Sequence, residues 1–409
     1  MTHSTSTSDV LIIGAGIYGL AAAHELHTRG YQHITVLDPG PIPHPLAAST
    51  DISKVIRLEY GADEEYMMLA AAAITGWLRW NDEWGETLYH EWGVTMLAHE
   101  PMTPGGYEYD SYHLARQHGF TPERLNVDEI SRRFPAWRPG RYVDGFYHAK
   151  GGWAESGRVI ETLAQTAIAK GIGLLPYHTV SEIIRERGRV AGVRTREGHT
   201  LSATEIIVCA GTWSQLLIPE LKTILKTTGH PVFHLKPPDP TLFQTPNFTV
   251  FTADISNSGW YGFPWHPQAQ IIKIANHGPG QTLHPVKDER IVTPADEANL
   301  RTFLANTFPA LTESPIVYTR RCCYSDTLDG HFWIDRHPEL TGLTVAAGGS
   351  GHAFKFGPVL GWLIADALEG KHNSYSHKFC WRTLPQETQQ EEAARYKSSS
   401  PPLAGEEQI

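Results

Sequence analysis

The chain has 409 residues with a formal net charge of −10, and 41% of its residues are hydrophobic. This is the composition of a globular protein long enough to bury two cores, and it excludes a disordered or fibrous chain. The acidic balance, without a long basic run, argues against a nucleic-acid partner.

The N-terminus, MTHSTSTSDV, has neither the basic start nor the apolar run of a signal peptide. No window holds the roughly 18 apolar residues of a membrane helix. The four cysteines do not make the disulfide framework of a small secreted domain, and the C-terminal EQI differs from the peroxisomal SKL. We therefore expect a cytoplasmic protein that does not contact a membrane.

The first predicted elements form a nucleotide-binding unit. An apolar strand over residues 10–13 leads into Gly14, Gly16 and Gly19 in GxGxxG spacing, and an alanine-rich helix then runs to Gly30. In such a unit the first glycine makes the tight turn, the second lets the backbone approach a pyrophosphate, and the third lets helix and strand pack closely. The free N–H groups and the dipole of the helix N-terminus then hold the phosphates.

The second predicted strand, HITVLD, ends at Asp38, 24 residues after Gly14. The Asp38 carboxylate is placed to accept hydrogen bonds from a ribose, which favours FAD or NAD over NADP. Further on, EIIVCAGTWS at residues 205–214 is typical of a buried strand that runs into a small-residue turn at Ala210 and Gly211, where a backbone can lie against a nucleotide. The N-terminal glycine motif together with this later stretch favours FAD.

Between and after these motifs the sequence pattern changes several times. Residues 81 to about 150 are rich in Trp, Tyr and His and lack a βαβ rhythm. The rhythm returns with a helix that ends at Lys170 and a strand over residues 173–186, and a proline-dense, strand-rich stretch follows from about Ile218. A strand, LTVAAGG, and a helix, FGPVLGWLIADALEG, close the fold.

We therefore expect an α/β fold with two domains and a tail. A discontinuous Rossmann-like FAD-binding domain faces an antiparallel-sheet α+β domain that binds the substrate. The polar C-terminal tail has few large apolar residues and is expected to be flexible. The predicted boundaries are residues 1–84, 150–218 and 322–382 for the first domain, 85–149 and 219–321 for the second, and 383–409 for the tail.

Four separated parts of the chain resemble the sarcosine oxidase and fructosyl amino acid oxidase (amadoriase) group of the D-amino acid oxidase-like flavoprotein superfamily. They are IIGAGIYG, STDISKVIRLEYG, IIKIANHGPGQ, and the pair RRCCYSDTLDGHFWIDRHP and AAGGSGHAFKFGPVLG, in one order from about residue 8 to residue 372. The resemblance implies a covalent-FAD oxidase of a secondary amine that carries a carboxylate, such as sarcosine, pipecolate, saccharopine or a fructosyl amino acid. It also implies hydride transfer to flavin N5 and reoxidation by oxygen to hydrogen peroxide.

The resemblance assigns a role to one of the adjacent cysteines Cys322 and Cys323. In the group, a cysteine in the context Arg-x-Cys-x-x-x-Asp-Thr is bonded through sulfur to the 8-methyl carbon of the flavin, and the match here is Cys322, which follows Arg320 and Arg321. Flanking arginines would lower the thiol pKa and favour the attacking thiolate. A vicinal disulfide, a metal-binding pair and two inert core thiols are the alternatives, although no further ligands stand at metal-site spacing.

The resemblance also implies cations around the flavin ring. Arg57 and Lys355 match the two positions that bind the substrate carboxylate in sarcosine oxidase, where an arginine fork forms two parallel hydrogen bonds and a lysine adds a point charge. Lys273 matches a lysine that lies over the flavin and activates oxygen, because a fixed positive charge stabilises a superoxide-like species. At the position of Lys54, the fructosyl amino acid oxidases usually have a lysine, whereas sarcosine oxidase usually has an arginine. Lys54 therefore matches the first of these and leaves the substrate class open. Surface charge for Arg57 and Lys355, and edge-strand protection for Lys273, are the alternatives.

Further side chains match the group at single positions. Tyr261, Tyr324 and His277 are expected to line the pocket or to polarise the amine, with packing as the alternative. His352 is expected to contact the flavin or the backbone rather than to transfer protons. The other expected cofactor contacts are Gly14, Gly16, Ile17, Tyr18, Gly19, Asp38, Ser49, Thr50, Lys54, Ala210, Gly211, Trp213, Gly349, Gly351, Phe354 and Lys355.

Two other functions stay open. The first is an FAD-dependent tailoring enzyme that oxidises an N-methyl or imino group in a biosynthetic pathway, and this enzyme needs the same cations and the same hydride geometry. The second is a non-enzymatic nucleotide-binding sensor, which would not need a tethered cofactor. For the enzyme, the expected partners are a small amine and molecular oxygen, and the expected state is a monomer or a weak homodimer.

Overall fold

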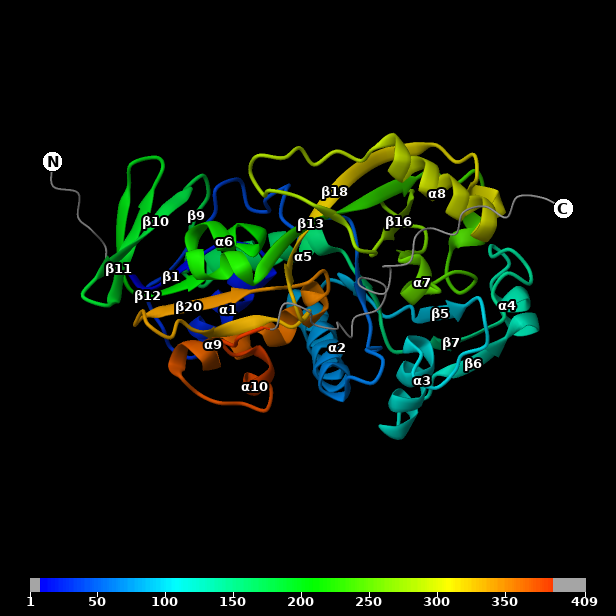
Figure 1. Cartoon of the computed structure of the whole chain (residues 1–409), viewed down its shortest axis with the longest axis horizontal. Coiled ribbons are helices and arrows are strands. Elements are labelled where there is room, and N and C mark those ends of the chain that lie inside the picture. Colours follow the sequence, from blue (N-terminus) through cyan, green and yellow to red (C-terminus); the bar gives the residue numbers. More distant parts are fainter. Residues whose placement is uncertain (1–7, 385–409) are drawn as a thin grey trace.

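The computed structural model describes residues 8–384, so the predicted flexible tail lies outside the described residues from 385 onward. Two sheets lie side by side along the long axis of the molecule (Figure 1). A mostly parallel sheet flanked by helices occupies one half, and a mostly antiparallel sheet occupies the other. This arrangement confirms the predicted fold class.

The first sheet has eight strands and is built around β1, which pairs in parallel with β2 and with β12. β1 and β20 are buried along nearly their whole length, as expected for parallel strands covered on both faces. The strands of this sheet are β1 (Ser8–Ile13), β2 (Ile34–Leu37), β9 (Gly173–Leu175), β10 (Val180–Glu186), β11 (Arg189–Thr195), β12 (Thr200–Val208), β19 (Trp333–Arg336) and β20 (Leu343–Ala347).

The single strand predicted over residues 173–186 is wrong, because two strands, β9 and β10, occupy that stretch. β9 is parallel to β2, whereas β10 is antiparallel to β11. The chain turns between them at Pro176 and Tyr177, and Tyr177 has a φ of 60°. A proline cannot donate a ladder hydrogen bond and a positive φ breaks an extended chain, so the stretch divides there.

Helices α1 (Ile17–Thr28), α5 (Ser156–Ala169) and α9 (Gly357–Glu369) flank this sheet, and α1 contacts both of the others. The contact between α1 and α9 is close because Gly361 has no side chain. A Cβ at Gly361 would lie 2.3 Å from the carbonyl oxygen of Ala21. Helix α1, whose start faces the site described below, is therefore held between α5 and α9.

The second sheet has nine strands and is covered by α8 (Pro294–Thr307), which lies along the upper edge of the molecule in Figure 1. Buried aromatic rings, among them Phe233, Phe251 and Phe303, fill the core that this sheet shares with α8. The strands are β5 (Val94–Ala98), β6 (Glu123–Asn126), β7 (Asp144–His148), β13 (Leu225–Leu235), β14 (Val250–Ala253), β15 (Trp260–Gly262), β16 (Ile272–Asn276), β17 (Gln281–Thr282) and β18 (Ile316–Thr327).

The remaining described elements connect or cover the two sheets. The helices are α2 (Glu64–Trp84), α3 (Tyr107–Gln117), α4 (Val127–Arg133), α6 (Ser214–Leu217), α7 (Ile255–Ser258) and α10 (Ser376–Phe379). A small third sheet contains β3 (Lys54–Ile56), β4 (Tyr89–His90) and β8 (Gly152–Ala154).

β18 pairs with β13 along almost its whole length, from Leu235↔Ile316 to Leu225↔Thr327. The predicted boundary between residues 321 and 322 lies inside this strand. The domain boundaries remain predictions, and the structure shows one continuous strand where the sequence suggested a change of domain.

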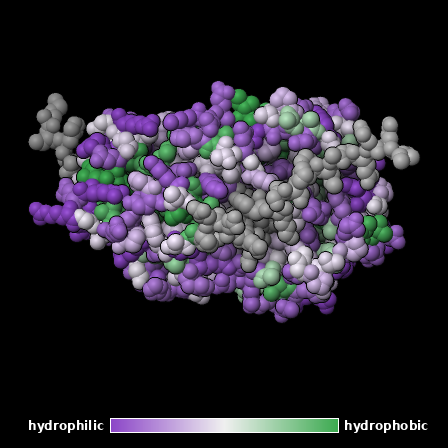
Figure 2. Space-filling model, viewed as in Figure 1, coloured by the Kyte–Doolittle hydropathy of each residue, from purple (hydrophilic) through white to green (hydrophobic). Residues whose placement is uncertain are grey.

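The face drawn in Figure 2 is largely hydrophilic, with hydrophobic residues scattered in small groups. Within residues 8–384, every helix is too short or too polar to cross a membrane.

Candidate active site

The first cavity of interest lies at the carboxyl ends of β1, β2, β12 and β20, where the residues that follow each strand line it. This edge of a parallel sheet is where doubly wound folds bind their ligands. Most of the predicted cofactor contacts line this cavity, and with them Cys323 and Tyr324. The predicted contacts found there are Gly14, Gly16, Ile17, Tyr18, Asp38, Ser49, Lys54, Ala210, Gly211, Trp213, Gly349, Gly351 and Phe354.

The glycine turn at the start of α1 leaves no room for side chains. A Cβ on Gly14 would lie 2.5 Å from the carbonyl oxygen of Cys209, and a Cβ on Gly19 would lie 1.9 Å from the carbonyl oxygen of Gly14. Gly19 does not line the cavity, so it serves helix packing. Gly16 faces the cavity, with the Ser49 hydroxyl 3.2 Å from where its Cβ would be, and that hydroxyl accepts a hydrogen bond from the first N–H of α1 at 3.0 Å.

Asp38 is held at the cavity edge by two backbone hydrogen bonds. Its Oδ2 accepts from the N–H of Ala15 at 3.0 Å and its Oδ1 from the N–H of Gly40 at 3.1 Å. Burial raises the pKa of the Asp38 carboxyl, and the two backbone donors act against that rise. Each oxygen keeps a further lone pair, so the oriented carboxylate can still accept from a ribose hydroxyl.

Buried polar atoms along the cavity fit a polar dinucleotide. The Tyr18 hydroxyl and the Ser325 hydroxyl, both on lining residues, are buried and have no hydrogen-bond partner within residues 8–384. Such atoms are costly when they stay unpaired, so they indicate a bound ligand or water. Burial raises the pKa of Tyr18, so its hydroxyl remains protonated and can donate. With the bare glycine turn and Asp38, these residues fit FAD.

Arg57 and Lys355 meet at one aromatic ring. Lys355 Nζ donates to the Tyr60 hydroxyl at 2.7 Å and lies 4.5 Å from the ring centre, while the Arg57 guanidinium carbon lies 5.2 Å from the same centre. Arg57 also donates to the Tyr107 hydroxyl at 2.8 Å and to the carbonyl of Glu59. Both cations are only 5% exposed, which excludes the surface-charge alternative.

His352 lies behind Tyr60 and is held on both ring nitrogens. Its Nδ1 is 3.0 Å from the Tyr60 hydroxyl and its Nε2 is 3.0 Å from the carbonyl oxygen of Gly330. We expected His352 to contact the flavin or the backbone, and its bond to Gly330 is a contact with the backbone. Of the predicted cofactor contacts, those that do not line the cavity are Gly19, Thr50, Cys322, His352 and Lys355.

Lys54 and Lys273 are two lysines near Cys322. Lys54 lines the cavity and its Nζ is 4.0 Å from Cys322 Sγ. Lys273 is 1% exposed, and its Nζ donates to Asp51 Oδ2 at 2.7 Å and to the carbonyl of Ser53 at 2.6 Å. β16 lies between β13 and β15, so the edge-strand alternative for Lys273 is excluded. Sequence reasoning missed Asp51, although it stands in the quoted segment STDISKVIRLEYG, because nothing local indicates its partner.

Tyr261, His277 and Tyr324 form an aromatic cluster next to Gly351. The ring centres of His277 and Tyr324 are 5.7 Å apart, and those of Tyr261 and His277 are 6.4 Å apart. A Cβ on Gly351 would lie 2.5 Å from Tyr324 and 2.8 Å from His277, so a residue without a side chain is needed there. Sequence reasoning missed His230, which stacks on Tyr324 with ring centres 4.0 Å apart. The cluster forms because β13, β16 and β18 are neighbours, which no local pattern reveals.

The two adjacent cysteines differ in their surroundings. Successive side chains of a strand point to opposite faces, and Cys322 packs among Val232, Ala275 and Tyr324 whereas Cys323 lines the cofactor cavity. Burial raises the pKa of the Cys323 thiol. Both thiols are free, and residues 8–384 hold no cluster of three His, Cys, Asp or Glu side chains that could bind a metal.

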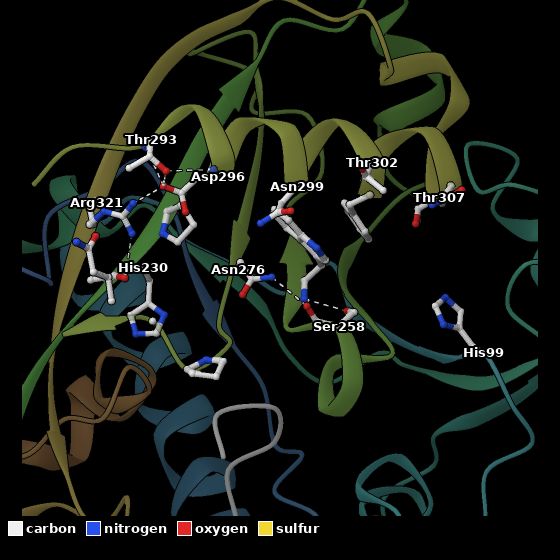
Figure 3. A pocket seen from close by; sticks show the side chains of 18 of the residues that line it. His99, His230, Ser258, Asn276, Thr293, Asp296, Asn299, Thr302, Thr307 and Arg321 are labelled. Atoms are coloured by element: carbon white, nitrogen blue, oxygen red, sulfur yellow. Dashed lines mark hydrogen bonds and ion pairs between the residues drawn. The ribbon is translucent and has the colours of Figure 1, made fainter. Parts of the chain in front are cut away.

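A second cavity lies between α8 and the antiparallel sheet (Figure 3). Its wall includes Arg321, which is paired with Asp296 at the start of α8, and Asn276, whose amide donates to the carbonyl of Ser258 at 3.0 Å. It contains none of the predicted site residues, although His230, a lining residue, stacks on Tyr324. The predicted site therefore gathers around the first cavity and the cluster behind it.

Residues 9–367 match the DAO family, described as FAD dependent oxidoreductases. This chain belongs to that family. FAD is thus the cofactor of this chain, and the glycine turn, Asp38 and the unpaired hydroxyls that line the first cavity fit such a cofactor.

Curated relatives are similar along nearly the whole chain. Monomeric sarcosine oxidase of Bacillus sp. (strain B-0618) is 29% identical over 370 residues, covering 89% of this chain and 93% of the relative. N-methyl-L-tryptophan oxidase of Escherichia coli (strain K12 / DH10B) is 30% identical over 375 residues, covering 90% and 96%.

Among solved structures, the fructosyl amine:oxygen oxidoreductase (Amadoriase I) of Aspergillus fumigatus has a TM-score of 0.79 to this chain at 27% sequence identity. The match covers 93% of this chain and 91% of that one. The predicted resemblance to the sarcosine oxidase and amadoriase group is therefore confirmed, from both sequence and fold.

Proposed function

We propose that this FAD-dependent enzyme is an oxidase of a secondary amine that carries a carboxylate. The observation that carries the proposal is the buried pair Arg57 and Lys355, which converge on Tyr60. A carboxylate suits both an arginine fork and a lysine point charge, so a substrate carboxylate could contact the two cations together. The named relatives support this choice, since sarcosine and N-methyl-L-tryptophan are both amino acids with a methylated amine.

The side chains around the pair can orient such a substrate. When bound, FAD accepts a hydride from the carbon beside the nitrogen and passes the electrons to oxygen. Rapid transfer requires reacting atoms held about 3 to 3.5 Å apart, and fixing the carboxylate with two cations restricts the substrate in this way. The cluster of Tyr261, His277 and Tyr324 is proposed to line the amine side. Burial raises the pKa of Tyr261, so its hydroxyl stays protonated and can donate to the substrate.

Cys322 is the proposed covalent tether, through a thioether to the 8-methyl carbon of the flavin. Forming this bond removes one hydrogen from the methyl carbon and one from the thiol, so two electrons and two protons pass to oxygen and leave as hydrogen peroxide. The Lys54 ammonium, 4.0 Å from the sulfur, supports the role because a nearby cation stabilises the attacking thiolate. Cys323 has its pKa raised by burial, which disfavours its thiolate.

Peroxide release from a panel of amines tests the proposed function. The panel contains sarcosine, N-methyl-L-tryptophan, pipecolate, saccharopine and a fructosyl amino acid, with N-methylbenzylamine as the amine that lacks a carboxylate. We expect peroxide from at least one carboxylate-bearing amine and little from N-methylbenzylamine. Equal turnover of the amine without a carboxylate would contradict the role of Arg57 and Lys355. A flavin-loaded protein that releases no peroxide from any secondary amine would contradict the oxidase proposal as a whole.

A further inference from the structure

A buried carboxylate lies between two basic side chains next to the proposed flavin site. Asp51 Oδ2 is 2.7 Å from Lys273 Nζ, and Asp51 Oδ1 is 3.5 Å from His234 Nε2. The side chains of Asp51 and Lys273 are 2% and 1% exposed, and that of His234 is 10% exposed. His234 and Lys273 stand opposite each other on the paired strands β13 and β16, so their positions are set by sheet register.

The surroundings of this cluster are mostly positive. Lys54 comes from the same segment as Asp51, and β18 contributes Arg320, whose guanidinium donates to the carbonyl of Thr50. The titratable or charged groups that act on the Asp51 and Lys273 pair include Lys54, His234, Tyr261, Arg320 and Cys322. Asp51 is therefore the carboxylate that balances several cations at this place.

The charge of Lys273 depends on this carboxylate. The pKa of Lys273 is lowered to about 8, chiefly by burial and also by the charge of Lys54, while the charge and hydrogen bond of Asp51 act in the opposite direction and raise it. Burial alone would raise the pKa of Asp51, but the Lys273 charge and the nearby His234 ring, 3.5 Å away, hold it well below its usual range. Without Asp51, Lys273 would be a buried amine beside Lys54 with its main source of stabilisation removed.

We propose that Asp51 is a positioning residue that fixes Lys273 and keeps its ammonium charged beside the flavin. The inference rests on the proposed function, in which Lys273 assists the reaction with oxygen. The geometry supports it because Lys273 has its other hydrogen bond to the carbonyl of Ser53, in the same segment. Asp51 and Ser53 thus hold one ammonium from both sides, and Lys54, which follows Ser53, lines the cofactor cavity.

The test uses the flavin-loaded protein and the variant Asp51→Asn, with His234→Gln as the matched control from the same cluster. The first readout is the flavin absorbance spectrum between pH 6 and 10, because loss of a nearby charge perturbs the ring. We expect the wild type to show a transition near the Lys273 pKa of about 8. In Asp51→Asn the transition should move to lower pH by about one unit or more, the scale of removing one close opposite charge. In His234→Gln it should stay close to that of the wild type.

The second readout separates the two half-reactions. At pH 8 we expect reoxidation of the reduced Asp51→Asn protein by oxygen to slow by about tenfold or more, the effect of losing a preorganised charge, while anaerobic reduction by the amine changes little. Asp51→Glu, which keeps the carboxylate, should restore most of the reoxidation rate. Equal slowing of both half-reactions, or an unchanged transition with unchanged reoxidation, would overturn the inference.

Two further outcomes are informative. If no amine reduces the flavin of the wild type, the proposed function fails, but the spectral transition of Asp51→Asn still tests the charge of Lys273 separately. If Asp51→Asn does not fold, Asp51→Ser takes its place, because it also removes the charge but keeps a hydroxyl that can accept a hydrogen bond from Lys273. A displaced transition would then support the inference, and a transition identical to that of the wild type would overturn it.

Discussion

The buried cations of the site lie in two separate groups, one at the Tyr60 ring and one at Asp51. Lys355 donates to a neutral phenol at Tyr60, whereas Lys273 is paired with the carboxylate of Asp51. Arg57 and Lys355 converge on the Tyr60 ring, so a substrate carboxylate that reaches this place could contact both cations. Lys273 lies elsewhere, with Asp51 as its partner.

Replacing Arg57 with alanine should weaken carboxylate-bearing substrates specifically. The expected rise in KM is about tenfold to a hundredfold, which corresponds to about 1.5 to 3 kcal/mol for a charged hydrogen bond. Steady-state kinetics with an N-methyl amino acid and with N-methylbenzylamine measure this, and the second substrate is the control. Arg57→Lys should recover part of the affinity. An unchanged KM for the amino acid would remove Arg57 from the substrate site.

The cysteine pair gives a second residue-scale prediction. Cys322→Ser should leave the flavin extractable by trichloroacetic acid, because oxygen at this position cannot form the thioether. Cys323→Ser is the matched control and should leave the flavin attached, since burial raises the pKa of the Cys323 thiol and disfavours its thiolate, although Cys323 lines the cavity. A mass spectrum of each denatured protein checks the outcome. A flavin that stays attached in Cys322→Ser would show that the tether lies elsewhere.

At the scale of elements, the glycine turn before α1 separates packing from cofactor binding. Gly19→Ala should destabilise the protein even without flavin, because the new Cβ would lie 1.9 Å from a backbone carbonyl that cannot move freely. Gly16→Ala should leave the unfolding of the flavin-free protein nearly unchanged but reduce flavin incorporation, since its Cβ would have only the Ser49 hydroxyl as a close neighbour, at 3.2 Å, and both residues line the cavity. Thermal unfolding of apoprotein from riboflavin-limited cells measures the effect on packing. The flavin content of protein from normally grown cells measures the effect on cofactor binding, so the two measurements together distinguish the two variants. Equal loss of stability in both variants would contradict this division.

Elements with a strong local signal could be predicted, and contacts between distant segments could not. The turn at Gly14 and the acid at Asp38 have a spacing that the βαβ unit imposes, and both line the predicted cavity. By contrast, the pairing of Asp51 with Lys273 joins the loop before β3 to β16, and the stacking of His230 on Tyr324 follows from strand order in the second sheet. Strand order is set by long-range packing, so neither contact leaves a periodic pattern in the chain.

At the scale of the whole molecule, one buried pair ties the segment that carries Arg57 to the second sheet. Glu59 Oε1 is 2.8 Å from Nδ1 of His148 on β7, and their side chains are 0% and 2% exposed. Burial would raise the pKa of Glu59, but the hydrogen bond and charge of His148 and the charge of Arg57 hold it below its ordinary value. Folding therefore favours the ionised carboxylate. This contribution to stability is present above the ordinary pKa of 4.5 and is lost as the pH falls through the lower folded value.

Glu59→Gln should lower the free energy of unfolding near neutral pH by about 3 kcal/mol, the scale of breaking a buried pair by removing one partner. The variant should also lose less stability than the wild type between pH 5 and the acid limit, because it lacks the carboxylate that must be protonated. Denaturant unfolding at several pH values measures both effects. Glu182→Gln, on an exposed ion pair of β10, is the control and should change stability by less than about 1 kcal/mol. Parallel pH curves for wild type and Glu59→Gln would contradict the assignment.

The course of β18 has a mechanical consequence for the loaded enzyme. Cys322 belongs to the antiparallel sheet through its pairing with His230, while the cavity that would receive the nucleotide is built on the carboxyl edge of the parallel sheet. A flavin bonded to that sulfur would act as a cross-link between the halves of the molecule. Cofactor attachment would then restrict any opening of one half against the other. The step that completes the enzyme would therefore also make it more rigid.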